Sequence, residues 1–301
     1  HSHLKRMHLH AATSGLLTAI ACPFFQANAG SSDPRLAAYY DRFLAICKDA
    51  VYEWNDADVP RRVATGARRV GVGRSLRYML RHDGQLVAWE DDPAQQETFA
   101  SSVKTFAAGR SGVFIVKDDD TLWHIENSGI LGFGEGLGDA PTPVAAGVLT
   151  ASIGDSANYY VTQSGDLFVK GLAHRGQYGD GKLRETDQFV RTATGVTQVS
   201  AHTGHALILK ANGEVWGTGG NIYGPVGRHG FGDKAIAWSK IFAGADTMAT
   251  GSSHSAAISY GRDLWVWGRD IGLDPKRVLT KVDAVAAGTS STIALSQGAL
   301  W

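Results

Sequence analysis

The sequence predicts an all-β fold, a β-propeller of about six to seven blades that is preceded by an N-terminal helix. Two observations support this prediction. Glycine is abundant, with 37 residues against 8 prolines, which suits a fold that contains many tight turns. In addition, one strand-turn-strand pattern recurs six times after residue 60. Strand-rich units that repeat every ~40–50 residues are typical of propeller blades, which pack around a central axis.

Residues 1–29 have the features of an export signal. Two basic residues precede a moderately apolar run over 11–21, and Ala27-Asn28-Ala29 provides a small-x-small cleavage site. The apolar run is too short to span a bilayer as a stable helix. We therefore expect an exported protein, periplasmic or extracellular, whose mature chain begins at Gly30. A lipoprotein anchored through Cys22 is the alternative.

Residues 30–58 are predicted to form an amphipathic helix. Asp33 is a good N-cap, and Pro34 fits the first helical position, where its missing N–H would have no partner. The large apolar residues that follow have helical spacing and would form one stripe. They are Leu36, Tyr40, Phe43, Leu44, Cys47, Val51 and Trp54. Such a stripe would cover the flank or an open end of the next domain, with Cys47 as a buried thiol.

Residues 59–301 contain the six repeats. Each has an anchor residue, a mostly apolar segment, a turn such as Asp83-Gly84 or Asn212-Gly213, and a second apolar segment. Asp-Gly and Asn-Gly pairs favour two-residue hairpin turns, so each repeat predicts a β-hairpin. The anchors are Gly73, Gly109, Gly154, His202, Gly251 and Gly288. The repeat cores lie near 70–89, 106–125, 151–171, 199–219, 248–268 and 285–301. A single hairpin cannot bury both of its faces, so neighbouring repeats are expected to stack.

Several of these repeats carry motifs of a known family. They include Gly251-Ser252-Ser253-His254-Ser255-Ala256, Val266-Trp267-Gly268 and Gly176-Gln177-Tyr178-Gly179. On these motifs the region from about residue 65 resembles the regulator-of-chromosome-condensation (RCC-type) repeat family. The resemblance implies a propeller that usually has seven blades. It also implies a protein partner, since exported members include protein-binding inhibitors and one branch promotes guanine-nucleotide exchange.

The sequence ends at Trp301, inside the last predicted hairpin. One explanation is that the natural chain continues beyond this point, and this is the one that we favour. The alternative is that a strand near Val59–Val63 completes the last blade and closes the ring.

No catalytic, metal-binding or cofactor-binding constellation is predicted. His205 and His254 occupy the same repeat position, where side-chain packing or hydrogen bonding explains them better than metal coordination. Lysine plus arginine equals aspartate plus glutamate, 29 each, so the broad basic field of a nucleic-acid-binding protein is missing. We expect a monomer that has no membrane span.

The predicted function is non-catalytic protein binding or scaffolding, with a partner of unknown identity. Two long loops over 173–188 and 221–238 are the best candidates for the binding surface, because loops carry function on a repeat scaffold. The candidate partner-binding residues are His174, Arg175, Tyr178, Tyr223, Arg228, His229 and Phe231. A glycosidase-like propeller hydrolase is the alternative, since Asp119-Asp120 faintly resembles the aspartate boxes of such enzymes. A guanine-nucleotide-exchange regulator is less favoured, because it requires a cytoplasmic partner.

Overall fold

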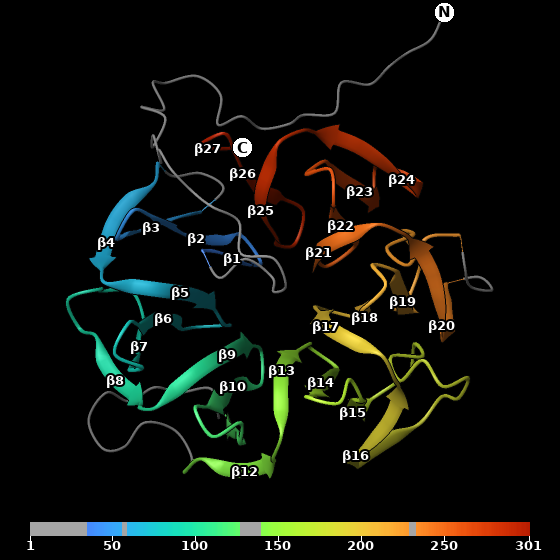
Figure 1. The fold of residues 1–301 in the computed structure, drawn as a ribbon, viewed down its shortest axis with the longest axis horizontal. Coiled ribbons are helices and arrows are strands. Elements are labelled where there is room, and N and C mark those ends of the chain that lie inside the picture. The colour runs from blue at the N-terminus through green and yellow to red at the C-terminus, as the bar shows by residue number, and fades with distance from the viewer. Residues whose placement is uncertain (1–34, 56–58, 127–139, 229–232) are drawn as a thin grey trace, which may run out of the picture.

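Seven antiparallel sheets are arranged around one axis in the computed structural model (Figure 1). The structure describes residues 35–55, 59–126, 140–228 and 233–301. Each sheet is one blade, and its strands follow one another in sequence order. The first strand of each blade lies at the axis and the last lies at the rim (Figure 1). The predicted β-propeller is therefore confirmed, with seven blades.

The strands of blades 1 to 3 come first in the chain. Blade 1 contains β1 (Leu36–Tyr39), β2 (Arg42–Cys47), β3 (Ala50–Asn55) and β4 (Arg61–Thr65). Blade 2 contains β5 (Ala67–Val72), β6 (Arg77–Arg81), β7 (Leu86–Trp89) and β8 (Glu97–Ala100). Blade 3 contains β9 (Val103–Gly109), β10 (Gly112–Lys117), β11 (Leu122–Glu126) and β12 (Thr142–Ala145).

The strands of blades 4 to 7 complete the ring. Blade 4 contains β13 (Val148–Ile153), β14 (Ala157–Thr162), β15 (Leu167–Leu172) and β16 (Glu185–Ala193). Blade 5 contains β17 (Val196–Ala201), β18 (His205–Lys210), β19 (Val215–Gly220) and β20 (Lys234–Phe242). Blade 6 contains β21 (Ala245–Thr250), β22 (His254–Ser259), β23 (Leu264–Gly268) and β24 (Gly272–Leu279). Blade 7 contains β25 (Val282–Ala287), β26 (Thr292–Ser296) and β27 (Ala299–Leu300).

The predicted helix over 30–58 is wrong for the residues that the structure describes. The segment 36–55 forms three strands of blade 1, and no helix occurs anywhere in the described part of the chain. Residues Phe43 to Cys47 in β2 are all buried, because neighbouring blades cover both faces of the sheet. A short, continuous apolar run of this kind fits helical spacing as well as it fits a buried strand.

Cys47 also differs from the expectation. It is the last residue of β2 and is buried, but it takes part in a disulfide and is not a thiol. The other cysteine of the sequence, Cys22, lies outside the described residues, as does the predicted signal over 1–29.

Blades 7 and 1 close the ring by direct packing. The strand predicted near Val59–Val63 exists as β4, but it is the outer strand of blade 1 and does not pair with blade 7. Instead, the Thr289 N–H donates to the Tyr40 carbonyl at 2.9 Å. An apolar cluster beneath this bond joins Phe43 of blade 1 to Ile293 of blade 7.

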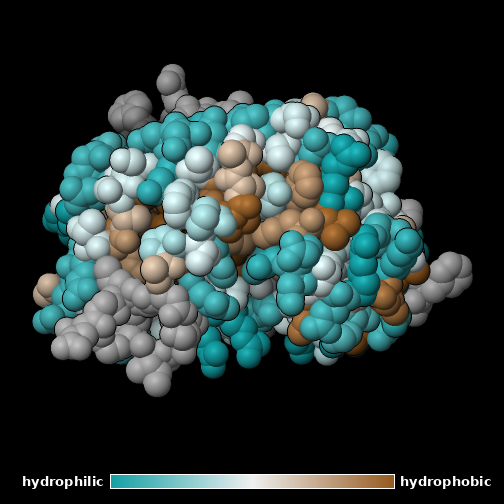
Figure 2. Space-filling view, turned by 90° about the horizontal axis from the view of Figure 1, so that it is seen from below, coloured by the Kyte–Doolittle hydropathy of each residue, from teal (hydrophilic) through white to brown (hydrophobic). Residues whose placement is uncertain are grey.

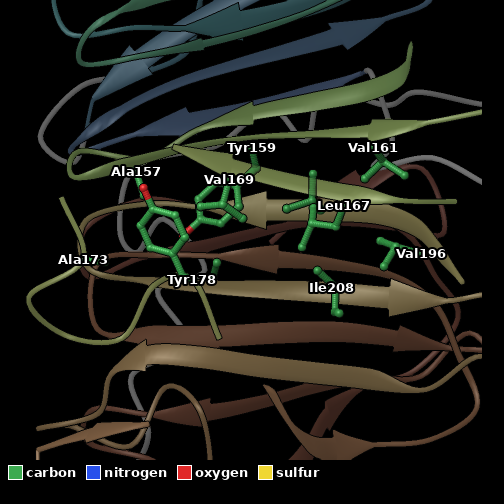
Figure 3. Packing of buried hydrophobic residues seen from close by; sticks show 11 residues of the cluster. Ala157, Tyr159, Val161, Leu167, Val169, Ala173, Tyr178, Val196 and Ile208 are labelled. Carbon is green, nitrogen blue, oxygen red and sulfur yellow. The ribbon is translucent and has the colours of Figure 1, made fainter. Parts of the chain in front are cut away.

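The core lies between blades, not within them. The cluster in Figure 3 joins β14 and β15 of blade 4 to β17 and β18 of blade 5. Its members include Tyr159, Val169 and Ile208, none of which is more than 1% exposed. Because each blade depends on its neighbours for this burial, the seven blades stabilise one another around the ring.

The two faces of the propeller are built differently. Strand direction alternates in each blade, so the connections from first to second strand and from third to fourth strand share one face, which we call the loop face. The opposite face, the turn face, carries short turns such as Asp83-Gly84 and Asn212-Gly213, with Gly84 and Gly213 at φ +81° and +79°. Both long loops predicted from the sequence therefore lie on the loop face.

Candidate functional site

A central channel runs between the seven innermost strands. It contains about 170 Å³ of open space and is lined largely by small residues, including Ala37, Gly71 and Ala151. Small side chains are required here because seven strands converge on the axis. Tyr39 and His202 line this channel, and both stand where their strands reach the loop face.

Four residues form a cluster at this mouth of the channel, which we call the mouth cluster: Tyr39, Tyr40, Asp155 and His202. The Tyr39 hydroxyl donates to Asp155 Oδ1 at 2.9 Å, and the Tyr40 hydroxyl donates to Asp155 Oδ2 at 3.3 Å. The His202 ring stacks on Tyr39, with ring centroids 5.2 Å apart. Blades 1, 4 and 5 therefore meet over the channel through side chains that are distant in sequence.

Burial sets the electrostatics of the mouth cluster. Desolvation, followed by the Asp155 charge, raises the pKa of Tyr39 far above its usual range, and the same causes raise the pKa of Tyr40. Burial also lowers the pKa of His202, so the neutral imidazole is favoured. Its Nε2 is buried and has no hydrogen-bond partner among the described residues. Tyr40, by contrast, is 41% exposed, which makes it the part of the cluster most accessible from solvent.

On blades 5 to 7, a row of side-chain hydroxyl groups lies at the mouth of the channel. Thr203 Oγ1 donates to Ser252 Oγ at 3.1 Å, and Ser252 Oγ donates to Thr289 Oγ1 at 3.4 Å. Each of these residues directly follows the anchor of its repeat. The corresponding residues of the other repeats are Arg74, Arg110 and Asp155. The position after the anchor is therefore polar in all six repeats and faces the mouth, so this recurring polar residue is a sequence signal that could have located the site.

The two long loops have the same backbone design. In blade 4 the Gly176 N–H donates to the Ala173 carbonyl at 3.1 Å, and in blade 5 the Gly224 N–H donates to the Asn221 carbonyl at 3.0 Å. Each loop reaches over the next blade. The Thr218 hydroxyl of blade 5 donates to the Gly176 carbonyl at 2.8 Å, which fastens the first loop to its neighbour. The first loop therefore connects its blade to the next one and also forms part of the protein surface.

The second loop is fastened in the same way. The Pro225 carbonyl accepts from the Trp267 indole Nε1 at 2.7 Å and from the Ser255 hydroxyl at 2.8 Å, both in blade 6. All three groups are buried. The tryptophan of the Val-Trp-Gly motif thus holds the preceding blade's loop in place.

Tyr178 is not available to a partner, which corrects the prediction. Its side chain is 0% exposed and points into the cluster between blades 4 and 5 (Figure 3). The hydroxyl donates to the Gly171 carbonyl at 3.0 Å, and the Arg184 guanidinium lies over the ring. Tyr178, the third residue of the motif Gly176-Gln177-Tyr178-Gly179, is therefore part of the core between blades.

The other candidate residues of these loops lie at the surface where the structure describes them. His174 and Arg175 are exposed, and the Arg175 side chain lies beside Gly204 and Gly220 of blade 5. Tyr223 is 49% exposed, with the Arg269 guanidinium 4.8 Å from the centre of its ring.

Arg228 is exposed as well and forms a two-pronged ion pair with Asp274 of blade 6, with both N···O distances 2.5 Å. His229 and Phe231 lie outside the described residues. The loop face therefore brings four predicted residues to the surface: His174, Arg175, Tyr223 and Arg228.

His205 and His254 have the repeat-locked role that their spacing predicted. His205 Nε2 lies 2.9 Å from Ser255 Oγ of blade 6, and His254 Nε2 lies 2.8 Å from Thr292 Oγ1 of blade 7. Burial lowers the pKa of His205 to about 3 and that of His254 to about 4. Both are neutral hydrogen-bonding groups that join successive blades.

The aspartates that resemble an aspartate box form a hairpin turn. Asp119 Oδ1 accepts from the Thr121 N–H at 3.0 Å and from the Thr121 hydroxyl at 2.6 Å. Asn212 makes the corresponding bond to the Glu214 N–H at 3.1 Å on the turn face of blade 5. Side-chain oxygens of this kind stabilise tight turns, so the motif has a structural role here.

Exposed apolar side chains gather at the loop-face ends of blades 4 to 6. They are Leu172, Leu183, Ile222, Tyr223, Ile236 and Leu273. A second apolar region is visible at the rim between blades 3 and 4, over β12 and β16 (Figure 2). In the interior between these blades, the Phe189 ring lies against Phe114 and Tyr160, with the Tyr160 and Phe189 centroids 4.8 Å apart. On the loop face of blades 4 to 6, the exposed apolar side chains thus lie on the same surface as charged groups such as Arg228 and Asp274.

The described residues show neither a metal site nor a membrane-spanning helix. No group of three or more histidine, cysteine or acidic side chains there is placed to hold a metal ion. None of the same residues forms a helix that is long and apolar enough to cross a membrane.

Comparison with known proteins gives distant relatives. No family model matches the chain. It is 27% identical over 140 residues to a bifunctional serine/threonine-protein kinase/NEDD4-like E3 ubiquitin-protein ligase of Dictyostelium discoideum. It is 25% identical over 196 residues to the E3 ubiquitin-protein ligase HERC2 of Homo sapiens. These matches cover 40% and 60% of this chain but only 7% and 4% of the relatives, so the chain corresponds to a small part of each.

The structural matches extend over most of the chain. Prp20p from Saccharomyces cerevisiae, the yeast RCC1, has a TM-score of 0.73 at 16% identity and covers 86% of this chain and 81% of its own. Human WBSCR16 has a TM-score of 0.71 at 16% identity and covers 91% of this chain and 88% of its own. The chain is therefore a seven-bladed β-propeller with the fold of RCC1 (Prp20) and related propellers.

Proposed function

We propose that the chain is a non-catalytic protein-binding propeller that presents its loop face to a partner outside the cytoplasm. The contrast between the two faces is the observation that carries this proposal. The loop face holds the mouth cluster, the long loops and the exposed apolar side chains of blades 4 to 6, whereas the turn face consists of tight hairpins. Tyrosine and arginine at the surface, as at Tyr223 and Arg228, are typical of interface hot spots.

The similar structures support a protein partner. Prp20p binds Gsp1p and histones, and the yeast RCC1 has been solved bound to Kap60. A rigid ring that presents variable loops is well suited to such binding, because the scaffold fixes the loops at little entropic cost.

A matched pair of tyrosine variants tests the loop face. Tyr223 is 49% exposed on the loop face and Tyr260 is 62% exposed on the turn face, so Tyr223→Ala and Tyr260→Ala remove the same side chain from opposite faces. A partner captured from the native compartment should bind Tyr223→Ala roughly tenfold more weakly, as expected for a hot spot. It should bind Tyr260→Ala as the wild type. An equal loss of affinity for the partner in both variants, or no loss in either, would contradict a binding surface on the loop face.

Export is the second part of the proposal. A reporter that works only outside the cytoplasm should become active when it is fused to residues 1–32. The disulfide of Cys47 does not bear on export, because cleavage after Ala29 would remove Cys22 and lipidation would block its sulfur. An intramolecular disulfide of Cys47 requires Cys22, which cleavage after Ala29 would remove.

Sequencing the mature N-terminus separates these cases. A start at Gly30 supports cleavage after Ala29 and rules out an intramolecular disulfide. A start at a lipidated Cys22 supports the lipoprotein alternative. A reporter that stays inactive would overturn export itself.

Likeness to RCC1 favours one other function, a guanine-nucleotide-exchange-type regulator. Prp20p binds Gsp1p, so the direct assay is release of labelled GDP from Gsp1p in the presence of this chain. Accelerated release would support the exchange function and argue against an exported binding module.

A further inference from the structure

Three arginines follow one another around the mouth of the channel on blades 1 to 3. Arg42 Nη1 donates to the Arg74 carbonyl at 3.3 Å. The Arg74 N–H in turn donates to the Gly109 carbonyl at 3.4 Å, and Arg110 is the next residue. Arg42 begins β2, and Arg74 and Arg110 lie in the β5–β6 and β9–β10 connections, so all three lie at the loop face. We call Arg42, Arg74 and Arg110 the arginine arc.

The guanidinium groups of Arg74 and Arg110 are not neutralised by the protein. Both residues are exposed, and neither side chain has an ion pair or hydrogen bond among the described residues. Most other described arginines are paired with acids. These are Arg61, Arg77, Arg184, Arg191, Arg228, Arg262, Arg269 and Arg277. Two neighbouring arginines without counterions are therefore unusual on this surface.

The arginine arc borders the mouth cluster. The positive charge of Arg110 opposes the rise in the pKa of Tyr39 and Tyr40, and that of Arg74 opposes the rise in the pKa of Tyr40, so both charges reach the cluster. The Asp155 carboxylate accepts hydrogen bonds from both tyrosine hydroxyls. Asp155, the acid of the mouth cluster, thus accepts its hydrogen bonds from the two tyrosines and not from the arginine arc.

We propose that the arginine arc binds a carboxylate-rich segment of a partner protein, with exposed Tyr40 beside it as an aromatic contact. This inference rests on the proposed protein-binding function and adds the chemistry of the partner. Guanidinium forks bind carboxylates through paired, charge-assisted hydrogen bonds, which gives both affinity and orientation.

A nucleic acid fits the same surface less well. The chain has no net charge, with 29 basic and 29 acidic residues, whereas binding to a phosphate backbone depends on an extended basic field. Asp41 and Asp155 follow the anchor position in blades 1 and 4 and would repel a phosphate chain that crosses the mouth. Arg74 and Arg110 lie on blades 2 and 3, so a short acidic peptide that contacts these two arginines need not cross blades 1 and 4, which carry the aspartates.

A fluorescein-labelled oligoglutamate peptide is the probe, and fluorescence anisotropy at low ionic strength is the measurement. The wild type should bind the peptide, and binding should weaken as salt is added, because exposed charges are screened. The double variant Arg74→Gln/Arg110→Gln should bind about tenfold more weakly or worse, since each lost charge-assisted bond weakens binding substantially. The matched control is Lys48→Gln/Lys281→Gln. It removes the same charge from exposed positions away from the loop face and should bind as the wild type.

A reversal variant keeps the proposal testable if neutral variants have small effects. Arg74→Glu/Arg110→Glu should lose oligoglutamate binding and gain binding to a labelled oligolysine peptide. Circular dichroism and thermal melting establish that each variant is folded, as expected for changes at exposed side chains.

Three outcomes would overturn the proposal. They are a wild type that does not bind oligoglutamate, equal loss in the arginine-arc variant and its control, and tighter binding of a thymidine oligonucleotide than of the peptide. These failures are distinct from failure of the proposed function. A partner whose capture depends on Tyr223 but not on Arg74 and Arg110 would leave the protein-binding function standing and reject only the acidic partner.

Discussion

Acid should destabilise this propeller through two buried histidines, well above the pH at which its carboxylates become protonated. His205 and His254 are 2% and 5% exposed, and burial lowers their pKa values from 6.5 to about 3 and about 4. In the unfolded chain both rings return to the ordinary value. Below about pH 6.5 the unfolded state therefore binds protons that the native state excludes, so stability falls as the pH falls.

The size of the effect follows from these pKa values. Each pH unit between the unfolded and native pKa costs about 1.4 kcal/mol per histidine. From neutral pH to about pH 5 the loss is about 2 kcal/mol for each ring and about 4 kcal/mol for both. A loss of about 4 kcal/mol is a large fraction of the free energy of unfolding of a typical domain, which is about 5–15 kcal/mol. The shift should therefore be large in a urea titration followed by tryptophan fluorescence.

Two variants identify the source of the slope. His254→Gln keeps a hydrogen-bonding group near Thr292 Oγ1 but cannot titrate, so it should reduce the acid-induced loss by about 2 kcal/mol. Thr292→Val removes the partner and leaves the histidine in place. It should lower stability at every pH while keeping the slope between neutral pH and about pH 5. Stability that is flat across this window, or an unchanged slope in His254→Gln, would refute the role of the two histidines.

Two further predictions concern packing and charge. Gly109→Ala should destabilise the protein by about 1–3 kcal/mol, because the added Cβ would lie 2.5 Å from Ile153 Cγ2 and 2.9 Å from its carbonyl oxygen. Gly261→Ala is the control and should be within about 0.5 kcal/mol of wild type, since its nearest neighbour lies 3.7 Å away. Glu53→Ala should cost about 1.5–3 kcal/mol, because the buried Arg77 guanidinium loses its 2.5 Å pair with Glu53 and keeps only the 3.2 Å pair with exposed Asp91. Urea unfolding measures all three, and a Glu53→Ala variant as stable as wild type would show that water replaces the carboxylate.

The hairpin cores could be predicted from the sequence because their signal is local. In the third repeat, the apolar segment Tyr159 to Val161 and the pair Leu167-Phe168 fall in β14 and β15, joined by the predicted turn at Ser164-Gly165. Turn chemistry and apolar pattern act over a few residues and recur with each blade. The axial and rim strands have weaker patterns, because one faces the channel and the other faces solvent.

The first blade could not be recognised, for a physical reason. Its anchor position is held by Tyr40 at φ 54°, where other blades use glycine or histidine. Its apolar residues are buried on both faces, as in the other blades, but here they also fall at helical spacing, which favoured a helix over a strand. Because blade 1 was not recognised, the mouth cluster could not be predicted either. Tyr39 and Tyr40 belong to this blade and contact Asp155 across 116 and 115 residues of sequence.

The long loops show why residue type alone misplaces a binding surface on a propeller. A loop between the third and fourth strands must fasten its blade to the next and also face solvent, so its residues divide between two roles. Tyr178 and Val226 occupy equivalent places after Gly176 and Gly224, and both are fully buried. Residues that directly precede these glycines, Arg175 and Tyr223, are exposed. The position within the turn, and not aromatic character, thus decides which side chain can meet a partner.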